Sequence, residues 1–380
     1  MRRAISALTF ALLASVAVAT PAHATATQST VLHACDDGFI YPDNVDVAPD
    51  ANGVIHGFAA YRRSATCGNR IHYFEGSGTS WTSSGTALFG TVVSVAADAT
   101  GSYLLYIAEE AAGPRLVVAK RGLDGRTSRL AVLRTLDAAG SGEGGGSIVA
   151  RGGKWLAAFT GPGGTAGDTD LYQAGNLYST STAPTHLVRN GNAADSSPVL
   201  TLGPDGAPTV AWRRTVGDVQ SIRIARTTTG TSWAHQPVAT GPAFGRMSQL
   251  DVAVSTSGTV VAWTQSYNGP VVQVADNLTG SWRVQEPPSQ FTNGEGAWKP
   301  ALVVSGVKVA VGYSMGDEYP SDGAVIARRT TVGGEWTTTA VGTGSSIDSN
   351  AVVGFALKGT SLTSISVVGD TIYAVSGLTL

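Results

Sequence analysis

The clearest structural signal in this chain is GPDGAPTVAWRRT (residues 203–215), in which turn residues are followed by an alternating apolar run, Ala-Trp and a polar pair. The same pattern returns in STSGTVVAWTQS (residues 255–266), so Trp212 and Trp263 occupy the same place in two copies. Alternating apolar residues around a Gly-containing turn favour two antiparallel strands joined by that turn. We therefore expect a chain of repeated β-hairpins.

Seven segments share this hairpin pattern at intervals of about 50 residues, a spacing near that of kelch-like arrays. Each hairpin is followed by a third apolar run, and often by a fourth that begins at a Trp, as in TSWAHQPVAT and GSWRVQEPP. Four antiparallel strands per repeat are typical of a propeller blade. The sequence thus predicts an all-β fold, a seven-bladed β-propeller with four-stranded antiparallel blades. Six blades are the alternative, because the last segment is the weakest.

The last repeat has no room for an outermost strand, because the chain ends at Leu380 soon after TIYAVSG. We expect the N-terminal stretch STVLHAC (residues 29–35) to supply that strand, which closes the ring and hides an exposed edge. Both cysteines, Cys35 and Cys67, then lie on one face of the ring. An exported protein favours a disulfide between them. A metal pair is the alternative, and no His-Cys cluster flanks either residue.

The N-terminus has the features of an export signal. MRRAISALTFALLASVAVATPAHA (residues 1–24) combines two arginines, an apolar run and a small-residue exit at Ala22-His23-Ala24, with Ala26 as an alternative end. The run is shorter than the roughly 20 residues of a membrane-spanning helix. We expect a signal peptide over 1–24, a single propeller domain over 25–380, a secreted, extracellular protein and no membrane insertion.

Composition narrows the partners further. The net charge of −2 argues against nucleic acid, which is normally bound by a concentrated basic surface. Lysine is scarce relative to arginine, a bias typical of GC-rich bacterial genomes. The repeated tryptophans are expected to pack between neighbouring blades rather than to stack on sugar rings, because their positions recur; they are Trp81, Trp212, Trp233, Trp263, Trp282 and Trp336.

Candidate ligand-binding residues lie in the longer connections, which the repeat places on one face of the ring. Arginine forks suit carboxylates, acidic and tyrosyl groups can transfer protons, and Trp298 lies outside the repeated tryptophan positions. The predicted ligand-binding residues are Arg62, Arg213, Trp298, Asp317, Glu318 and Tyr319. The alternative is that arginine and acidic residues form structural pairs across adjacent blades.

The Trp-led turns carry a family resemblance. RTTTGTSW, ADNLTGSW and TTVGGEW resemble the Asp-box, Ser-x-Asp-x-Gly-x-x-Trp, of sialidase-like propellers, although Asp276 comes one position early and Gly333 keeps its offset without the Asp. The resemblance implies the propeller fold. Sialidases use an arginine triad, a tyrosine nucleophile with a glutamate partner and an aspartate acid, and no motif here carries those roles over to a particular residue.

Other active-site motifs are missing from the sequence. The histidines lack zinc-ligand spacing, the glycine-rich stretch at 140–147 lacks the Lys-Ser or Lys-Thr of a phosphate-binding loop, and no nucleophile elbow occurs. We therefore predict no catalytic residues, no metal and no cofactor. The favoured function is binding of an extracellular glycan or cell-surface polymer. The alternatives are a scaffold that binds a surface protein, and a sialidase-like glycoside hydrolase or polysaccharide lyase.

Overall fold

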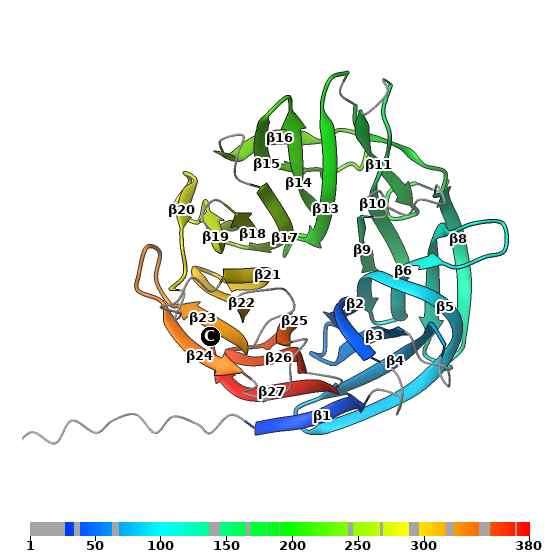
Figure 1. Ribbon diagram of the computed structural model, residues 1–380, viewed down its shortest axis with the longest axis horizontal. Helices are drawn as coiled ribbons and strands as arrows, with labels where there is room; N and C mark the ends of the chain where they lie inside the picture. The colour runs from blue at the N-terminus through cyan, green and yellow to red at the C-terminus, as the bar shows by residue number, and fades with distance from the viewer. Residues whose placement is uncertain are drawn as a thin grey trace, which may run out of the picture.

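The structure is a computed structural model that describes most of the chain after residue 26. The described ranges are 27–33, 39–62, 68–136, 145–164, 168–179, 181–189, 191–241, 246–266, 269–288, 296–316, 323–341, 350–368 and 371–380. Within them the fold is all-β, and antiparallel sheets stand around a common centre like the blades of a propeller (Figure 1). The described residues include no helix long and apolar enough to cross a membrane.

The strands fall into four ranks, counted outward from the centre. The innermost rank is β2 (Phe39–Pro49), β5 (Ser80–Asp98), β9 (Gly146–Arg151), β13 (Ala194–Leu202), β17 (Arg246–Ser255), β21 (Gly296–Ser305) and β25 (Asn350–Lys358). The second rank is β3 (Ile55–Arg62), β6 (Gly101–Ala108), β10 (Lys154–Pro162), β14 (Pro208–Val216), β18 (Gly258–Ser266), β22 (Lys308–Gly316) and β26 (Ser361–Val368).

The outer two ranks complete each sheet. The third rank is β4 (Arg70–Ser77), β7 (Arg115–Gly122), β11 (Thr169–Gly175), β15 (Val219–Arg226), β19 (Pro270–Asp276), β23 (Gly323–Arg329) and β27 (Thr371–Thr379). The outermost rank is β1 (Thr27–His33), β8 (Thr127–Thr135), β12 (Thr185–Val188), β16 (Ala234–Gly241), β20 (Arg283–Gln285) and β24 (Thr337–Val341), together with the first half of β5.

One boundary differs from the sequence-based expectation. The fourth run of the first repeat and the first run of the second were expected as separate strands, but β5 is continuous and pairs with β4 and then with β6. Gly90 lies where the strand passes from one sheet to the next, with a φ of 139°. A Cβ there would lie 1.9 Å from the carbonyl oxygen of Ile107, so only glycine fits.

The two ends of the described chain meet in one sheet. β1 pairs antiparallel with β27, with Thr27 opposite Ser376 and His33 opposite Thr371, so the sheet order is β1-β27-β26-β25. Figure 1 shows β1 lying along the outer side of β27. The outermost strand of the last sheet therefore comes from the N-terminal segment.

The core lies between neighbouring sheets. Trp212 packs among residues of β9–β11 as well as its own sheet, and Trp263 packs among residues of β14–β16. Trp336, at the turn before β24, packs against a cluster that includes Val260 and Val274 of the preceding sheet. The prediction that the repeated tryptophans pack between sheets is confirmed for all six, which are Trp81, Trp212, Trp233, Trp263, Trp282 and Trp336.

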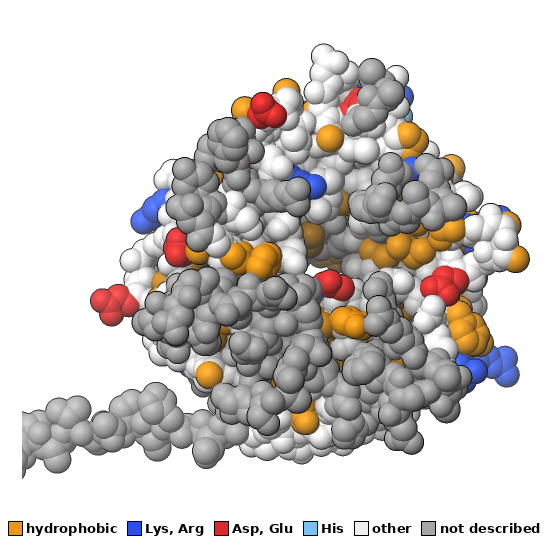
Figure 2. All heavy atoms as spheres, viewed as in Figure 1, with side chains coloured by type: hydrophobic (Ala, Val, Ile, Leu, Met, Phe, Trp, Pro, Cys, Tyr) orange, Lys and Arg blue, Asp and Glu red, His pale blue; other side chains and the backbone are white. Residues whose placement is uncertain are grey.

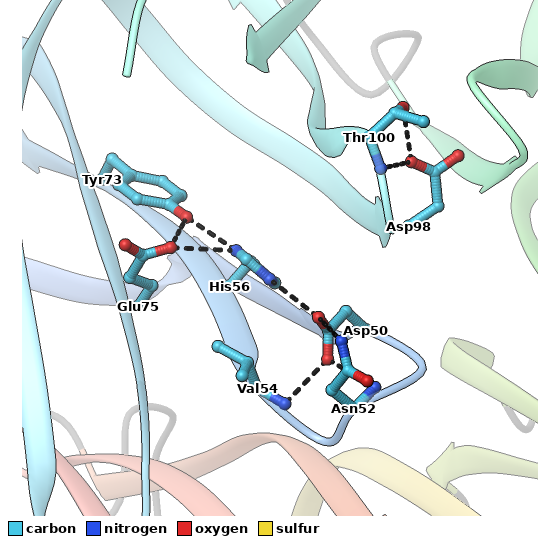
Figure 3. Close-up of polar contacts among 8 residues, drawn as sticks. All are labelled: Asp50, Asn52, Val54, His56, Tyr73, Glu75, Asp98 and Thr100. Carbon is cyan, nitrogen blue, oxygen red and sulfur yellow. Dashed lines mark hydrogen bonds and ion pairs between the residues drawn. The ribbon is translucent and has the colours of Figure 1, made fainter. Parts of the chain in front are cut away.

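Aspartates fix the hairpin turns between the first two ranks. The Asp50 carboxylate accepts hydrogen bonds from the amides of Asn52 (2.9 Å) and Val54 (2.8 Å), and the Asp98 carboxylate accepts one from the amide of Thr100 (2.8 Å), as Figure 3 shows. Such bonds let the side chain take the place of a backbone partner in a tight turn. DVAPDANG therefore forms a hairpin turn, as its sequence indicates.

We expect Trp263→Ala to lower the free energy of unfolding by about 3–5 kcal/mol, because the indole is fully buried between two sheets and its loss leaves a cavity. Leu123→Ala is the control, because that side chain is 80% exposed and its removal should cost about 0.5 kcal/mol or less. Urea denaturation of both variants measures the difference. Equal effects would contradict the packing role of Trp263.

Candidate functional site

The innermost strands share an unusual backbone feature near their starts. Ser197, Gln249 and Lys299 have φ values of 53°, 49° and 48°, and they lie at the register shifts of β13, β17 and β21. Non-glycine residues rarely adopt this left-handed conformation, and clusters of such residues are typical of functional sites. The three bulges stand side by side, because β13, β17 and β21 belong to consecutive sheets.

The bulges border a cavity at the centre of the ring. Two adjoining cavities of about 440 Å³ each are lined by residues of the innermost strands of every sheet, and they share Asp46, Ser94, Ser147, Val199, Asp251 and Val353 at the narrow zone between them. Figure 2, viewed as Figure 1, shows acidic and hydrophobic side chains around the middle of the molecule. We call the two together the axial cavity.

The two ends of the axial cavity differ in the side chains that line them. The end at the starts of the innermost strands has the polar and charged side chains Asp43, Ser197, Gln249 and Lys299 among Val, Leu, Ala, Pro and Gly residues. The other end is lined mostly by Val, Leu, Ala and Pro side chains from the same strands. The end with the polar side chains lies on the side where the chain enters the innermost strands, the side on which the sequence predicts the longer connections. We call it the polar mouth.

Asp46 and Asp251 lie in the narrow zone and link neighbouring sheets. The Asp46 carboxylate accepts a hydrogen bond from the amide of Val95 (2.6 Å), and the Asp251 carboxylate accepts one from the amide of Leu302 (2.6 Å). Val95 and Leu302 each belong to the innermost strand of the next sheet. The two carboxylates therefore hold the inner strands in register around the cavity.

Burial dominates the protonation of this pair. It raises the pKa of Asp46 to about 6, against the lowering effects of the amides of Val95 and Val47 and the charge of Lys299. It raises the pKa of Asp251 to about 7, against its amide hydrogen bonds, and the negative charge of Asp46 adds to the rise. Near neutral pH both carboxyl groups can therefore exchange protons, which is a property of general acids and bases as well as of buried structural groups.

Lys299 extends along the polar mouth. Its Nζ donates to the carbonyl oxygen of Pro42 and lies 3.1 Å from Oδ1 of Asp43. Its backbone amide is held by Oε1 of Gln249 (2.9 Å) and lies 3.2 Å from Oγ1 of Thr264. β25 lies between β21 and β2 in the ring, so the lysine passes the intervening sheet to reach β2.

Two of the predicted ligand-binding residues can be placed in full. Arg213 lies on β14 and donates to Oγ of Ser196 (2.9 Å) and to the carbonyl oxygen of Met247 (2.9 Å) in the next sheet. Trp298 is half-buried on β21, directly before Lys299, and is paired with Ser314 in the register. Neither side chain lines the axial cavity, although Trp298 adjoins the polar mouth in sequence.

The neighbour of Arg213 shows how arginine is used in this fold. Arg214 is buried and binds the carboxylate of Asp195 through two hydrogen bonds of 2.8 and 2.9 Å, and Asp195 also accepts from the indole of Trp212 (2.9 Å). This structural pair lies within one sheet, because Asp195 on β13 is the register partner of Arg214 on β14. For Arg213 a ligand-binding role stays a prediction.

The other predicted site residues cannot be compared with the cavity. Arg62 ends β3 opposite Phe39, and its side chain is outside the described part of the structure. Asp317, Glu318 and Tyr319 lie outside the described residues, as do Cys35 and Cys67. The convergence of Arg213 with Glu318 and Tyr319, and the disulfide, therefore stay predictions.

The cavity residues were not found by the sequence analysis, although one signal points to them. The triplet Asp-Val-Ala occurs at 46–48 and again at 251–253, and its aspartates are the two that link neighbouring inner strands. Gln249 and Lys299 have no such marker, because their importance comes from a backbone conformation that the sequence does not display.

A second polar cluster lies at the turn side of β2, β3 and β4 (Figure 3). The Tyr73 hydroxyl donates to Glu75 (2.6 Å) and lies 2.6 Å from Nδ1 of His56, so Nδ1 must carry the proton that it shares with the hydroxyl oxygen. Burial lowers the pKa of His56, against the carboxylates of Asp50 and Glu75. The cluster borders neither half of the axial cavity, and its contacts join the strands of one sheet.

The described residues offer no metal site of the usual kind. In these ranges no group of three or more His, Cys, Asp or Glu side chains is arranged to hold a metal ion. Asp46 and Asp251 are instead occupied by backbone amides.

Comparisons with known proteins agree on the fold. No protein-family model and no curated protein matches the sequence. An ulvan lyase of polysaccharide lyase family PL25 is similar in structure, with a TM-score of 0.59 and 10% identity over 92% of this chain and 95% of that one. The Penicillium chrysogenum α-L-arabinanase gives 0.50 and 12%, over 76% and 94%. The Fusarium graminearum α-L-arabinofuranosidase Arb93A gives 0.50 and 9%, over 92% and 97%.

These likenesses concern the fold alone, because the identities are low. They agree with the all-β, propeller-like arrangement of sheets that the sequence predicts.

We expect the stability of the wild-type protein to fall more steeply than that of Asp251→Asn as the pH rises from about 5 to about 8. The pKa of Asp251 is raised from 3.8 to about 7 on folding, so its contribution is fully present below the unfolded value and is lost as the pH rises through the folded one. The asparagine does not titrate. Urea denaturation at both pH values measures the two slopes, and parallel slopes would show that Asp251 does not titrate in this range.

Proposed function

We propose that this protein is a secreted, non-catalytic β-propeller that binds an extracellular carbohydrate at the polar mouth of its axial cavity. The proposal includes a ring of seven blades closed by β1. The ligand is held by polar groups on the bulges of the innermost strands. Secretion is inferred from the N-terminal signal pattern.

The blade count is supported by the ranks of strands and by the packing. Among the described residues, seven separate apolar clusters each draw on two neighbouring sheets, which is the number of interfaces that a closed ring of seven blades has. The cluster between the last and first sheets includes Val31 and Leu32 of β1. Closure in this way pairs the outer side of β27 with β1.

The observation that carries the functional proposal is the group of charged and polar side chains at one end of the axial cavity, Asp43, Ser197, Gln249 and Lys299. Small-molecule sites are concave and combine apolar walls with a few fixed polar groups. The polar mouth has this character, and its backbone is fixed by hydrogen bonds such as that between Gln249 and the Lys299 amide. Two structural neighbours have been seen with saccharides: the ulvan lyase is bound to -[GlcA(1-4)Rha3S]- and the arabinanase is complexed with arabinobiose.

Binding is preferred to catalysis because the carboxylates of the narrow zone already serve the fold. Asp46 and Asp251 accept backbone hydrogen bonds from neighbouring strands, which fixes their oxygens. Catalysis is the second candidate, because their raised pKa values suit proton transfer. Release of new reducing ends or of unsaturated products from a polysaccharide panel would favour it.

A protein-binding scaffold is the third candidate. It is supported by exposed apolar side chains near the edge strand β8, including Leu123, Leu130 and Val132. Large exposed apolar patches are typical of protein interfaces. Capture of one partner protein together with no binding to saccharides would favour it.

We expect Gly145→Phe to abolish saccharide binding without unfolding the protein. Gly145 lines the polar mouth, and a Cβ there would meet nothing closer than 3.8 Å, so an aromatic ring can enter the cavity without backbone strain. Gly164→Phe is the matched control, because a Cβ at that exposed glycine meets nothing within 4 Å and the residue does not line the axial cavity.

The measurement is a glycan array followed by titration calorimetry with the saccharides that bind. Equal binding by the two variants would place the site elsewhere, and binding of the wild-type protein to no saccharide would contradict the proposed function.

A further inference from the structure

Acidic residues outnumber basic ones among the described charged residues that line the axial cavity, and these residues differ in exposure. The described charged residues that line the axial cavity are Asp43, Asp46, Asp251 and Lys299. Asp46 and Asp251 lie in the narrow zone, where backbone amides hold them. Asp43 and Lys299 lie at the polar mouth and pair with each other at 3.1 Å. Lys299 is thus the one described cation that a ligand entering by this mouth would meet.

The fold fixes the position of residue 299, but it does not require a charged side chain there. The same left-handed bulge holds Ser197 in β13 and Gln249 in β17. Neither of these residues is charged, so the bulge itself does not require a lysine. The positive charge is particular to β21, where Gln249 and Thr264 fix the backbone of Lys299 from the preceding sheet.

The partner of Lys299 is easily replaced. The Asp43 side chain is 61% exposed, whereas the Lys299 side chain is 23% exposed. An exposed ion pair contributes little to stability, because water competes for both charges. A ligand carboxylate or sulfate could take the position of the Asp43 carboxylate and keep the ammonium neutralised. The carbonyl oxygen of Pro42 would still hold the lysine.

We propose that Lys299 selects anionic saccharides and that Asp43 is a built-in competitor which occupies the lysine until a ligand carboxylate or sulfate displaces it. This inference rests on the proposed function and specifies its ligand class. The shared chemistry is a monoanionic oxygen group on a sugar ring.

The test compares matched pairs of ligands that differ in charge alone. Oligogalacturonides are set against their methyl esters, and dextran sulfate oligomers against dextran oligomers, so the two arms separate carboxylate from sulfate. Affinities are measured by titration calorimetry at neutral pH for the full mature chain. The variants are Lys299→Met, Asp43→Asn and, as a control for general surface charge, Lys154→Met, an exposed lysine at the start of β10 that does not line the axial cavity.

We expect Lys299→Met to weaken binding of the preferred charged ligand by about tenfold or more, because a hydrogen bond to a charged group is lost. We expect Asp43→Asn to strengthen it by about two- to fivefold, since a competing exposed carboxylate is removed. Lys154→Met should leave it unchanged. If the Asp43–Lys299 pair only held the two strands together, Lys299→Met and Asp43→Asn would both weaken binding and lower the melting temperature.

Three results would overturn the inference. They are equal affinity for charged and uncharged members of each pair, weaker binding by Asp43→Asn, and an undiminished affinity in Lys299→Met. Equal affinity for charged and uncharged ligands leaves the proposed function intact if neutral saccharides bind and Gly145→Phe abolishes that binding. Failure of the wild-type protein to bind any saccharide overturns the proposed function as well.

Discussion

Each sheet of this protein can bury its two faces only against its neighbours, and this constraint determines most of the structure. The second-rank strands are largely buried on both faces, as in β10, where all residues from Trp155 to Gly161 are buried. The Trp-led turns extend the contact outward, because Trp233 donates from its indole to Gln173 of the preceding sheet (3.1 Å). Arg329 also links neighbouring sheets. It forms an ion pair with Asp276 at 2.5 Å that is buried under the ring of Trp336.

The same constraint acts differently at the centre, where the inner strands approach one another around a cavity. Apolar side chains cannot fill that space from strand edges, so polar side chains connect the sheets instead. Asp46 and Asp251 reach the amides of the next inner strands, and Ser94 accepts a weaker bond from the amide of Ile148 (3.3 Å). The cost is that two half-buried carboxyl groups lose part of their hydration, which raises their pKa values.

The sequence could predict the features that depend on local pattern. Alternating apolar residues and Gly-containing turns place the hairpins correctly, and recurring tryptophans indicate packing between sheets, as Trp212 and Trp263 show. It could not predict the polar mouth. Lys299 and Gln249 matter because a left-handed bulge in each brings them to one cavity, and Asp43 meets Lys299 only through the curvature of the ring. Such contacts depend on the distance between sheets, which no local pattern contains.

The difference between packed faces and inner-strand bulges explains where chemical variation can arise in the fold. A substitution on a packed face must keep both its size and its apolar character, because two sheets depend on it. A residue at a bulge near the start of an inner strand is not packed between two sheets, and its side chain borders a cavity. The bulges of β13, β17 and β21 accordingly hold a serine, a glutamine and a lysine on one backbone conformation. Repetition therefore supplies rigid positions, and the residues at these positions, rather than the blades, give the polar mouth its chemical character.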